Sequence, residues 1–461
     1  MADSQDARRN LPGVDKLLER PEFRKLRDVV SVPLQSRVIR EEIESARKNI
    51  EQGGAAPSGN QISRHAIERI ESYLTSRPHR VINCTGVILH TGLGRASLSA
   101  NAIEAIVESA GYCDLELDMD SGQRGDRQAH VESLLCWLTG AESALMVNNN
   151  AAALFLVLNA LANGKEVIVS RGQLIEIGGS FRLPDIMSRA GAKLVEVGTT
   201  NRTRVADFET AISNKTVMLL RAYPSNYRID GFSESVEIKE LAEVAHRHNV
   251  LCVDDLGGGL LWDWAKLGLP EEPHVAQSLA DGADLVLVSG DKVLGGPQAG
   301  IILGGADLVK KLKKSPLARV LRPGKLEVAA LAATLTSFFH PSRPAQEIPT
   351  WRMFAESLET TRARAELLKS KSAAKSGWQV LELRDSPAQA GSGTLPATPL
   401  PSIALVCLPK NTTAARWSKR LRQAQIPVVS VVQDELVFLN LRTVSDSEVE
   451  LLAAQILQSL E

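Results

Sequence analysis

Between about His79 and about His340, short β-rich runs alternate with helical stretches, and this alternation limits the possible folds more than any other feature. The runs are ALMV, EVIVS, KLVEV, VMLLRA, VLCVDD, LVLVSG and AGIILGG, and glycine or a polar residue follows most of them. Strands and helices that alternate at this spacing predict a mainly parallel sheet covered by helices. Ligands of such sheets bind at the carboxyl ends of the strands, so functional residues should directly follow the runs.

The segments on either side of this alternation have other patterns, so the sequence predicts three domains. Residues 1–75 are charged and helical, with apolar residues at helical spacing between Leu17 and Val30 and again between Gln35 and Ile50. They form a helical cap on the main domain or on a partner subunit, or else a surface that binds RNA. Residues 76–340 form the large domain that holds the sheet. A chain of 461 residues is too long for one compact core, which agrees with this division.

The sequence of residues 341–461 predicts a smaller C-terminal α/β domain. A long helical stretch comes first, followed by a disordered-looking loop at residues 385–401 that is rich in Pro, Gly, Ser and Ala. Three strand-like runs follow, SIALVCL, PVVSVVQ and ELVFLNLR, and the last two should form a hairpin that turns at residues 433–435. A final helix over residues 445–460 closes the chain.

Composition and charge argue against several classes of protein. The formal net charge is −1, so no global positive field indicates a nucleic-acid partner, although a local basic face stays possible. The polar N-terminus and the short apolar runs predict a chain without a signal peptide or membrane span, and therefore a cytoplasmic protein. The cysteines are widely spaced, with no CxxC pair, which predicts reduced, buried thiols and no metal site; they are Cys84, Cys113, Cys136, Cys252 and Cys407.

Lys292 follows the run LVLVSG and lies between glycines, in the stretch from Leu285 to Gly305. A lysine that holds pyridoxal 5'-phosphate as a Schiff base must approach a flat ring and be partly desolvated, so that its amine can be neutral. Glycines give the backbone room near the cofactor, and Ser289 at the end of the run could hydrogen-bond the cofactor phosphate. Taken alone, a lysine after Gly-Asp is usually a surface lysine.

Asp255 ends another apolar run, in VLCVDDLGGG. A buried carboxylate against the pyridine nitrogen keeps that nitrogen protonated, which makes the ring an electron sink. Asp254 is the alternative, and it should face the other side because neighbours in a strand alternate. Both aspartates could also simply cap the next turn.

Three asparagines, Asn148, Asn149 and Asn150, follow the run ALMV and precede a helical stretch. The free N–H groups and the dipole of a helix N-terminus suit a phosphate dianion, although ordinary capping would also explain asparagine there. The order phosphate turn, aspartate, lysine is that of the aminotransferase-like (fold type I) enzymes. The sequence therefore predicts this α/β fold class, with pyridoxal phosphate as cofactor, and does not name a substrate.

Longer stretches make the chain resemble the bacterial L-seryl-tRNA(Sec) selenium transferases, also called selenocysteine synthases. They cover nearly the whole chain and are LPGVDKLL, VINCTGVILHTGLGRA, NNNAAA, GKEVIVSRGQLIEIGGSFRLPDIM, EVGTTNRT, SNYRIDGF and SGDKVLGGPQAGIILG. The last of these matches the family's cofactor-lysine motif. Departures are small: Gly92 replaces an expected asparagine, Cys84 an apolar residue and Gly258 a serine. None of them touches Lys292 or Asp255.

The resemblance implies that the chain converts L-seryl-tRNA(Sec) to L-selenocysteinyl-tRNA(Sec) with selenophosphate, through a cofactor-bound aminoacrylyl-tRNA intermediate. Lys292 would anchor the cofactor and then abstract the α-proton as general base, while Asp255 holds the ring nitrogen. Asn226, in YPSNY, could hydrogen-bond the ring oxygen. The resemblance also implies tRNA binding by the N-terminal helices and a homo-oligomer, a pentamer of dimers with active sites at the dimer interfaces.

A selenophosphate anion needs cationic groups beside the ring. Arg95 follows the turn LHTGLG, and Arg319 and Arg322 are three residues apart, a spacing that places both on one face of a helical turn. Arginine forks match phosphate-like oxyanions, and by resemblance all three belong to the selenophosphate site. Each could instead be an ordinary surface arginine. Candidates with less support are Arg171, Arg182 and Arg202.

Arg442, in LVFLNLRTV, sits where an aminotransferase arginine would grip a substrate carboxylate, which an aminoacyl ester lacks. It could face the site, contact tRNA or be structural. Plausible tRNA phosphate contacts in the N-terminal region are Arg8, Arg9, Lys16, Arg24, Lys25 and Arg27. Two alternatives to the transferase stay open: a pyridoxal-phosphate lyase or desulfurase acting on a free amino acid, and a tRNA-binding homologue without catalysis.

Overall fold

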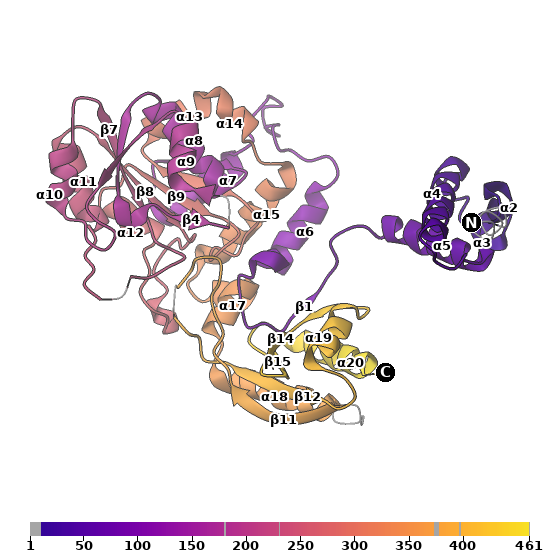
Figure 1. Ribbon diagram of the computed structural model, residues 1–461. Helices are drawn as coiled ribbons and strands as arrows, with labels where there is room; N and C mark the ends of the chain where they lie inside the picture. The colour runs from indigo at the N-terminus through magenta and orange to yellow at the C-terminus, as the bar shows by residue number, and fades with distance from the viewer. Residues whose placement is uncertain (1–10, 179–180, 230, 373–377, 396–397, 461) are drawn as a thin grey trace. The chain divides into compact units, whose positions relative to one another are not determined.

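The computed structural model describes residues 11–178, 181–229, 231–372, 378–395 and 398–460 (Figure 1). Contacts between its residues divide the chain into two compact units, Met1–Arg80 and Val81–Glu461. The second unit contains both the large and the C-terminal domain predicted from the sequence. A boundary between those two at residue 340 stays a prediction.

The N-terminal unit is helical, as predicted, and its helices enclose an apolar core of their own that includes Leu17, Phe23, Ile39 and Ile62. Its helices are α2 (Val14–Leu18), α3 (Pro21–Lys25), α4 (Val32–Glu51) and α5 (Gly59–Leu74).

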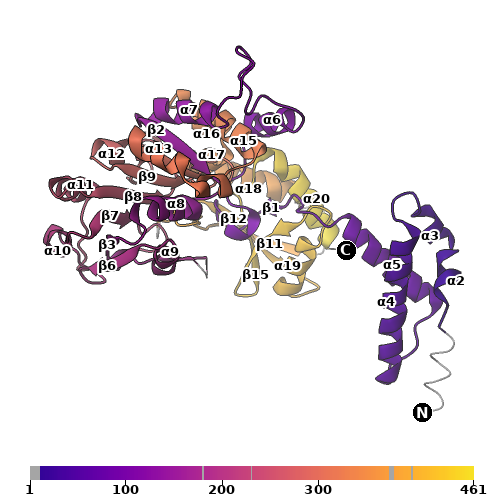
Figure 2. The same cartoon turned by 90° about the horizontal axis from the view of Figure 1, so that it is seen from above.

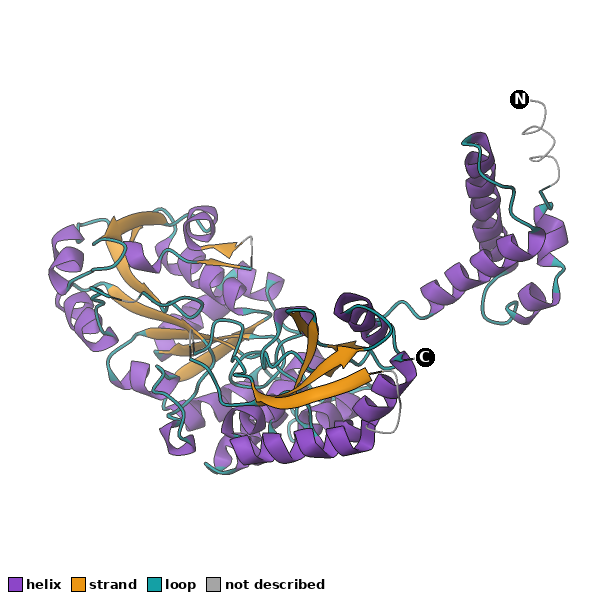
Figure 3. Ribbon diagram, turned by 60° about the horizontal axis from the view of Figure 1, so that its bottom comes forward, coloured by secondary structure: helices purple, strands orange, loops and turns teal. Residues whose placement is uncertain are grey.

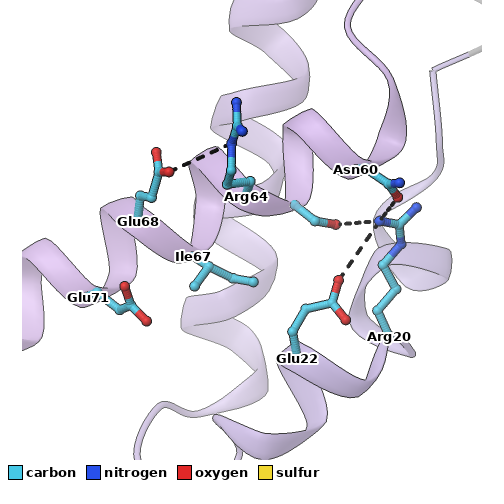
Figure 4. Close-up of a pocket in the computed structure, with 8 residues that line it drawn as sticks. Arg20, Glu22, Asn60, Arg64, Ile67, Glu68 and Glu71 are labelled. Carbon is cyan, nitrogen blue, oxygen red and sulfur yellow. Dashed lines mark hydrogen bonds and ion pairs between the residues drawn. The ribbon is translucent and has the colours of Figure 1, made fainter.

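Arg20, in the turn between α2 and α3, ties that turn to α5 (Figure 4). Its guanidinium donates to the Gly59 carbonyl, to Asn60 Oδ1 and to Ser63 Oγ, at 2.9 to 3.1 Å. An open hollow of about 330 Å³ lies beside this contact, and charged side chains of both signs surround Ile67 in it; they are Arg20, Glu22, Arg64, Glu68 and Glu71.

A seven-stranded sheet in the order β2-β10-β9-β8-β7-β3-β6 forms the centre of the second unit. Only β10 among these seven runs antiparallel to its neighbours, so the predicted mainly parallel sheet is confirmed. The strands are β2 (Ser143–Val147), β3 (Glu166–Ser170), β6 (Lys193–Val197), β7 (Thr216–Ala222), β8 (Leu251–Gly257), β9 (Leu285–Ser289) and β10 (Gly300–Gly304). Each coincides with one of the seven predicted runs.

Helices cover both faces of this sheet because successive strand residues alternate between two apolar cores (Figure 2). Along β7, Leu219 belongs to one core, and Met218 and Leu220 belong to the other. The helices around the sheet are α6 (Ala100–Ser109), α7 (Ala129–Thr139), α8 (Asn150–Ala162), α9 (Leu183–Arg189), α10 (Val205–Ala211), α11 (Ile238–Arg247), α12 (Val275–Ala280), α13 (Ala306–Lys314), α14 (Pro316–Val320) and α15 (Lys325–Thr336). A short pair, β4 (Glu176–Ile177) and β5 (Phe181–Arg182), was not predicted.

The C-terminal part holds a second, antiparallel sheet in the order β11-β12-β15-β14 (Figure 3). Its strands are β11 (Trp378–Asp385), β12 (Ile403–Pro409), β14 (Val431–Gln433) and β15 (Leu436–Asn440), and the helices that share its core are α18 (Leu358–Ser372), α19 (Ala414–Arg422) and α20 (Val449–Ser459). Two helices precede these, α16 (Arg343–Glu347) and α17 (Pro349–Ala355), and α17 packs into the core of the central sheet. The predicted hairpin is confirmed, since Gln433 pairs with Leu436 across Asp434 and Glu435, which both have positive φ. Strand β11 was missed.

The N-terminal end of the second unit joins this C-terminal part. Strand β1 (Ile82–Asn83) pairs in parallel with β13 (Val428–Val429). The backbone N–H groups of Ile88 and Leu89 then donate to the carbonyls of Gln389 and Ala390, at 2.9 and 2.8 Å. Residues more than three hundred positions apart are thus hydrogen-bonded side by side.

Two predictions are wrong in part: the disorder of one loop and the burial of all cysteines. The loop at residues 385–401 has a composition typical of disorder, but Ala388, Ala390 and Leu395 are buried within it, and its backbone is hydrogen-bonded; residues 396–397 lie outside the described residues. Not all cysteines are buried either, because Cys113 is exposed and Cys136 is partly exposed. Within the described part of the chain, no helix is long and apolar enough to cross a bilayer.

Candidate active site

Lys292 lies in the loop that connects β9 to β10, and its side chain is buried. Burial lowers the pKa of its amine, and the nearby carboxylates of Asp255 and Asp291 only partly offset this effect. The loop is closely packed: a Cβ on Gly290 would come 2.6 Å from the Pro297 carbonyl oxygen, so only glycine fits there. The structure therefore provides the partly desolvated amine that the sequence predicted.

Asp255 lies near the end of β8, the neighbour of β9 in the sheet, and its side chain is also buried. Burial raises the pKa of this carboxyl to about 6, although a hydrogen bond from Asn150 and the charge of Lys292 both act to lower it. The structure brings Asp255 and Lys292 together from two adjacent strands, as their spacing in the sequence indicated.

Asp254 belongs to a different environment. Its two carboxylate oxygens accept hydrogen bonds from Arg221 of β7, at 2.8 and 2.7 Å, and both side chains are buried. The pair joins β7 to β8, where Arg221 and Asp254 are in register. Asp254 is therefore already neutralised by a structural partner, whereas Asp255 faces the lysine.

The predicted asparagine turn lies at the start of α8, and its side chains make different contacts. Asn149 caps the helix, since its Oδ1 accepts from the Ala152 N–H at 2.9 Å. Asn150 Nδ2 donates to Asp255 Oδ1 at 2.8 Å. The Oδ1 atom of Asn150 is buried without a hydrogen-bond partner among the described residues. The N-terminus of α8 thus lies beside Asp255, and one buried polar atom there stays free for a ligand.

Ser289, the last residue of β9, is buried three positions before Lys292. The predicted Arg95 also reaches the lysine loop, because its Nη1 donates to Asp291 Oδ2 at 2.6 Å. The backbone supports this contact, since the Ala96 N–H donates to the Asp291 carbonyl at 3.2 Å. Arg95 itself has a positive φ, at the end of the LHTGLG turn.

Arg319 and Arg322 lie at and just after the end of α14, and both are exposed. Arg322 is 3.4 Å from Glu116 Oε1. Their segment runs past the asparagine turn, because the Asn148 N–H donates to the Leu321 carbonyl at 3.0 Å, and the Asn148 side chain is exposed. The backbone between the two arginines therefore lies next to the turn proposed for a phosphate.

Asn226 is exposed, and its Nδ2 donates to the Glu176 carbonyl at 2.9 Å. Its neighbour Ser225 is buried and lies near the lysine. A Cβ atom built on Gly257 would lie 4.0 Å from Ser225 Oγ and 3.7 Å from Lys292 Nζ. The two side chains therefore flank the same position beside Gly257. Sequence reasoning missed Ser225, because a serine in a loop carries no local signal of function.

Arg442 is structural. It is buried, and its guanidinium donates to the carbonyl oxygens of Pro401 and Met353. Two of the weaker arginine candidates form surface ion pairs, Arg171 with Glu196 and Arg182 with Glu176.

Comparison with known proteins agrees with this geometry. The family model described as L-seryl-tRNA selenium transferase matches residues 81–445, and that of the selenocysteine synthase N terminal matches residues 8–47. The L-seryl-tRNA(Sec) selenium transferase of Moorella thermoacetica is 44% identical over 463 residues, covering 100% of this chain and 98% of the relative. That of Desulfovibrio desulfuricans is 47% identical over 385 residues, covering 82% of this chain and 81% of the relative.

A solved structure of D-glucosaminate-6-phosphate ammonia-lyase is similar in fold. It has a TM-score of 0.57 and 20% identity, and the match covers 85% of this chain and 98% of that one. The predicted α/β fold class is confirmed by this likeness together with the observed sheet. The sequence matches extend over both compact units, and the chain belongs to the L-seryl-tRNA selenium transferase family.

Proposed function

We propose that this protein converts L-seryl-tRNA(Sec) to L-selenocysteinyl-tRNA(Sec), with selenophosphate as the selenium donor. The observation that carries the proposal is the buried Lys292 amine beside the buried Asp255 carboxylate, at the strand ends of a chain that belongs to this family. Relatives that match the chain over nearly its whole length bear the name of this activity.

The residues around Lys292 suit pyridoxal phosphate. A buried carboxylate, a desolvated amine and the free Oδ1 atom of Asn150 converge there, next to the N-terminus of α8. Asp255 would hold the ring nitrogen, and the N–H groups of α8 with Ser289 would hold the phosphate. When bound, the ring supplies an electron sink that lets serine lose its α-proton and its hydroxyl group.

Lys292 has two tasks in this proposal. Its amine would hold the cofactor, and the same amine would take the α-proton of the substrate as general base. Desolvation favours the neutral amine that both tasks require. Asn150 orients the Asp255 carboxylate through their 2.8 Å hydrogen bond, and Asn226, with its side chain on Glu176, would need to turn to reach the ring oxygen.

The selenophosphate anion would bind the guanidinium groups of Arg95, Arg319 and Arg322. Arg95 is held at the lysine loop by Asp291, and the segment of the other two runs past the asparagine turn. Arginine forks match phosphate-like oxygens in charge and geometry.

The proposed substrate is an ester of tRNA, and the contacts of Arg442 agree with an ester better than with a free amino acid. Arg442, the candidate for binding a free carboxylate, is already hydrogen-bonded to two backbone carbonyls.

We assign tRNA binding to the N-terminal unit, where Lys16 and Lys25 are exposed while Arg24 and Arg27 pair with Glu19. Arg8 and Arg9 lie outside the described residues. A tRNA substrate places the reaction in the cytoplasm.

A second copy of the chain is the partner proposed for an apolar surface of the second unit. Helix α6 exposes Ile103 and Val107, and exposed Trp137 of α7 packs edge-on against exposed Phe339, with ring centroids 4.7 Å apart. Exposed apolar side chains of this size are typical of subunit interfaces, which supports a homo-oligomer, predicted as a pentamer of dimers.

The test is the conversion of seryl-tRNA(Sec) in the presence of selenophosphate and pyridoxal phosphate. The Lys292→Ala variant should lose at least about 10²- to 10⁴-fold in rate, together with the visible absorption of the bound cofactor. Lys311→Ala, on the exposed surface of α13, is the control and should match the wild type. Turnover of free serine without conversion of seryl-tRNA would instead identify a lyase. A wild-type protein without cofactor absorption would indicate an inactive homologue.

A further inference from the structure

A side chain from outside the central sheet holds the backbone on the C-terminal side of Lys292. The indole N–H of Trp351, in α17, donates to the carbonyl oxygen of Val293 at 2.8 Å. Val293 directly follows Lys292, and both partners of this hydrogen bond are buried, with 1% of Trp351 and 2% of Val293 exposed. A buried backbone carbonyl needs a donor, so this contact stabilises the lysine loop.

Val293 is held on its other side by the segment that follows Asp255. The Val293 N–H donates to the Gly258 carbonyl at 2.9 Å, and Gly258 comes directly after the last residue of β8. Within the loop, the Gly295 N–H donates to the Lys292 carbonyl at 3.0 Å. The backbone of Lys292 is therefore connected through Val293 both to the strand that carries Asp255 and to α17.

Helix α17 approaches the lysine loop closely. A Cβ on Gly295 would come 2.2 Å from Ile348 Cγ2, and the φ of Gly295 is +75°, so only glycine permits this approach. Ile348 directly precedes α17 and is fully buried. The close packing of the loop against the start of α17 brings the Trp351 indole within reach of the Val293 carbonyl.

Other aromatic side chains fix the orientation of the Trp351 ring. We call Trp262, Trp264, Phe338 and Trp351 the aromatic cluster. The ring centroid of Trp351 lies 6.1 Å from that of Trp262 and 5.9 Å from that of Trp264. Phe338 packs edge-on against it at 5.4 Å, and aromatic pairs at such separations add to the stability that burial gives. The cluster therefore limits the directions in which the Trp351 N–H can point.

We propose that Trp351 is a positioning residue of the active site, whose indole N–H holds the Val293 carbonyl and so fixes the backbone that carries the Lys292 amine. The inference rests on the proposed function in taking Lys292 as the amine that holds pyridoxal phosphate. Trp351 acts through the backbone of Val293, and the proposal requires no contact of its side chain with substrate or cofactor.

Trp264 provides a matched control within the same cluster. It is as buried as Trp351, and its indole N–H also donates to a backbone carbonyl, that of Pro270 at 2.9 Å. Pro270 lies between β8 and α12, outside the lysine loop. The same substitution at Trp264 therefore removes an equal ring and an equal donor from the cluster, but leaves the Val293 carbonyl with its partner.

The experiment compares Trp351→Phe with Trp264→Phe in the full-length protein. Three quantities are measured: amide hydrogen exchange of Val293 and Gly295 in the cofactor-free protein, the visible absorption band after addition of pyridoxal phosphate, and kcat and KM for seryl-tRNA(Sec). A second pair of variants carries 3-benzothienylalanine in place of the same two tryptophans. This side chain keeps the shape of the indole ring and has a sulfur atom in place of the N–H.

Trp351→Phe should speed exchange at Val293 and Gly295 about tenfold relative to Trp264→Phe, because the Val293 carbonyl no longer has its donor. It should also shift the absorption band and lower kcat about tenfold, with KM within about twofold, since the proposed tRNA contacts lie in the other unit. Trp264→Phe should keep the wild-type band and a kcat within about twofold of the wild type. The benzothienylalanine variants should rank in the same order.

Equal exchange of the lysine loop in the two Phe variants would overturn the proposal, as would faster exchange in Trp351→Phe with an unchanged absorption band. If either Phe variant does not fold, the benzothienylalanine pair decides by the same two criteria, because neither member loses ring volume. A wild type that binds the cofactor but does not convert seryl-tRNA would refute the proposed function alone, since exchange and absorption are measured without that substrate.

Discussion

Asp254 and Asp255 are adjacent in β8, yet their side chains have different partners. Asp254 is fully buried against the Arg221 guanidinium, which donates two hydrogen bonds to its carboxylate. Asp255 receives one neutral hydrogen bond from Asn150 and faces a lysine whose own charge is disfavoured by burial. Asp255 thus lacks a full positive partner in the cofactor-free protein.

This difference predicts how stability depends on pH. Burial raises the pKa of Asp255 from its ordinary value of 3.8 to about 6, so between these values the folded, cofactor-free protein binds more protons than the unfolded chain. Stability should therefore fall as pH rises through this window, by up to about 3 kcal/mol. Thermal unfolding of the cofactor-free wild type and of Asp255→Asn at several pH values between about 4 and 7 measures the effect.

The Asp255→Asn variant cannot ionise at this position, so its stability should decline less over the same range. Bound pyridoxal phosphate should also reduce the decline in the wild type, because a protonated ring nitrogen supplies the missing charge. Parallel curves for the wild type and Asp255→Asn would show that folding leaves the pKa of Asp255 unchanged.

The residues that the sequence could predict are those that directly follow strands. Lys292 and Asp255 were predicted because an apolar run marks each strand and ligand sites gather at strand ends. Ser225 and Glu272 carry no such mark: one is a serine in a loop, and the other stands in Glu-Glu-Pro-His, a composition typical of exposed turns. Ser225 and Glu272 line one small cavity together with Gly393 and Thr394, which come from more than a hundred residues further along the chain.

At the scale of elements, periodicity identified all seven strands of the central sheet, because buried parallel strands are short and continuously apolar. The loop at residues 385–401 could not be predicted in this way. Its Pro, Gly, Ser and Ala content indicates disorder, whereas its backbone carbonyls at Gln389 and Ala390 accept hydrogen bonds from Ile88 and Leu89, at the other end of the unit. Interactions of this kind leave no periodic pattern in one sequence.

Residues 391–395, here called the strap, lie against Ser225 and give a prediction that separates backbone strain from steric overlap. Gly393 and Gly268 have φ of +71° and +72°, so alanine at either position costs about 1 kcal/mol or more of backbone strain. Only at Gly393 does the new Cβ meet an obstacle, Ser225 Oγ at 2.8 Å; nothing lies within 4 Å at Gly268. Gly393→Ala should therefore lower Tm more than Gly268→Ala and also alter the cofactor absorption band, which Gly268→Ala should leave unchanged.

Thermal unfolding and a visible spectrum of the two variants are sufficient. Equal decreases in Tm with unchanged spectra would mean that the strap can move away from Ser225 at no cost to the lysine site.

At the scale of the whole molecule, the chain separates into two compact units, and all predicted catalytic and cofactor residues lie in the second. The first unit has its own apolar core. A protein shortened to residues 81–461 should therefore keep the visible absorption of bound pyridoxal phosphate, and that absorption should still depend on Lys292.

The same shortened protein should bind seryl-tRNA(Sec) at least about tenfold more weakly, because we assign the phosphate-binding cations to the first unit. Removing a cation that neutralises a phosphate weakens binding and also makes it less sensitive to salt. Cofactor absorption and tRNA affinity at two salt concentrations test the assignment. Undiminished affinity with a normal spectrum would place the tRNA-binding surface in the second unit.

The reversed strand β10 has a consequence for how the protein is made. Strand β2 lies at one edge of the central sheet and pairs with β10 alone among these strands, which follows it by about 150 residues. At about 5 to 20 residues per second, the ribosome synthesises β2 roughly 10 to 30 s before its partner exists. During this interval the apolar β2 strand lacks its place in the sheet. Because the Lys292 loop ends where β10 begins, the nascent chain closes its central sheet and fixes both ends of the Lys292 loop in the same step.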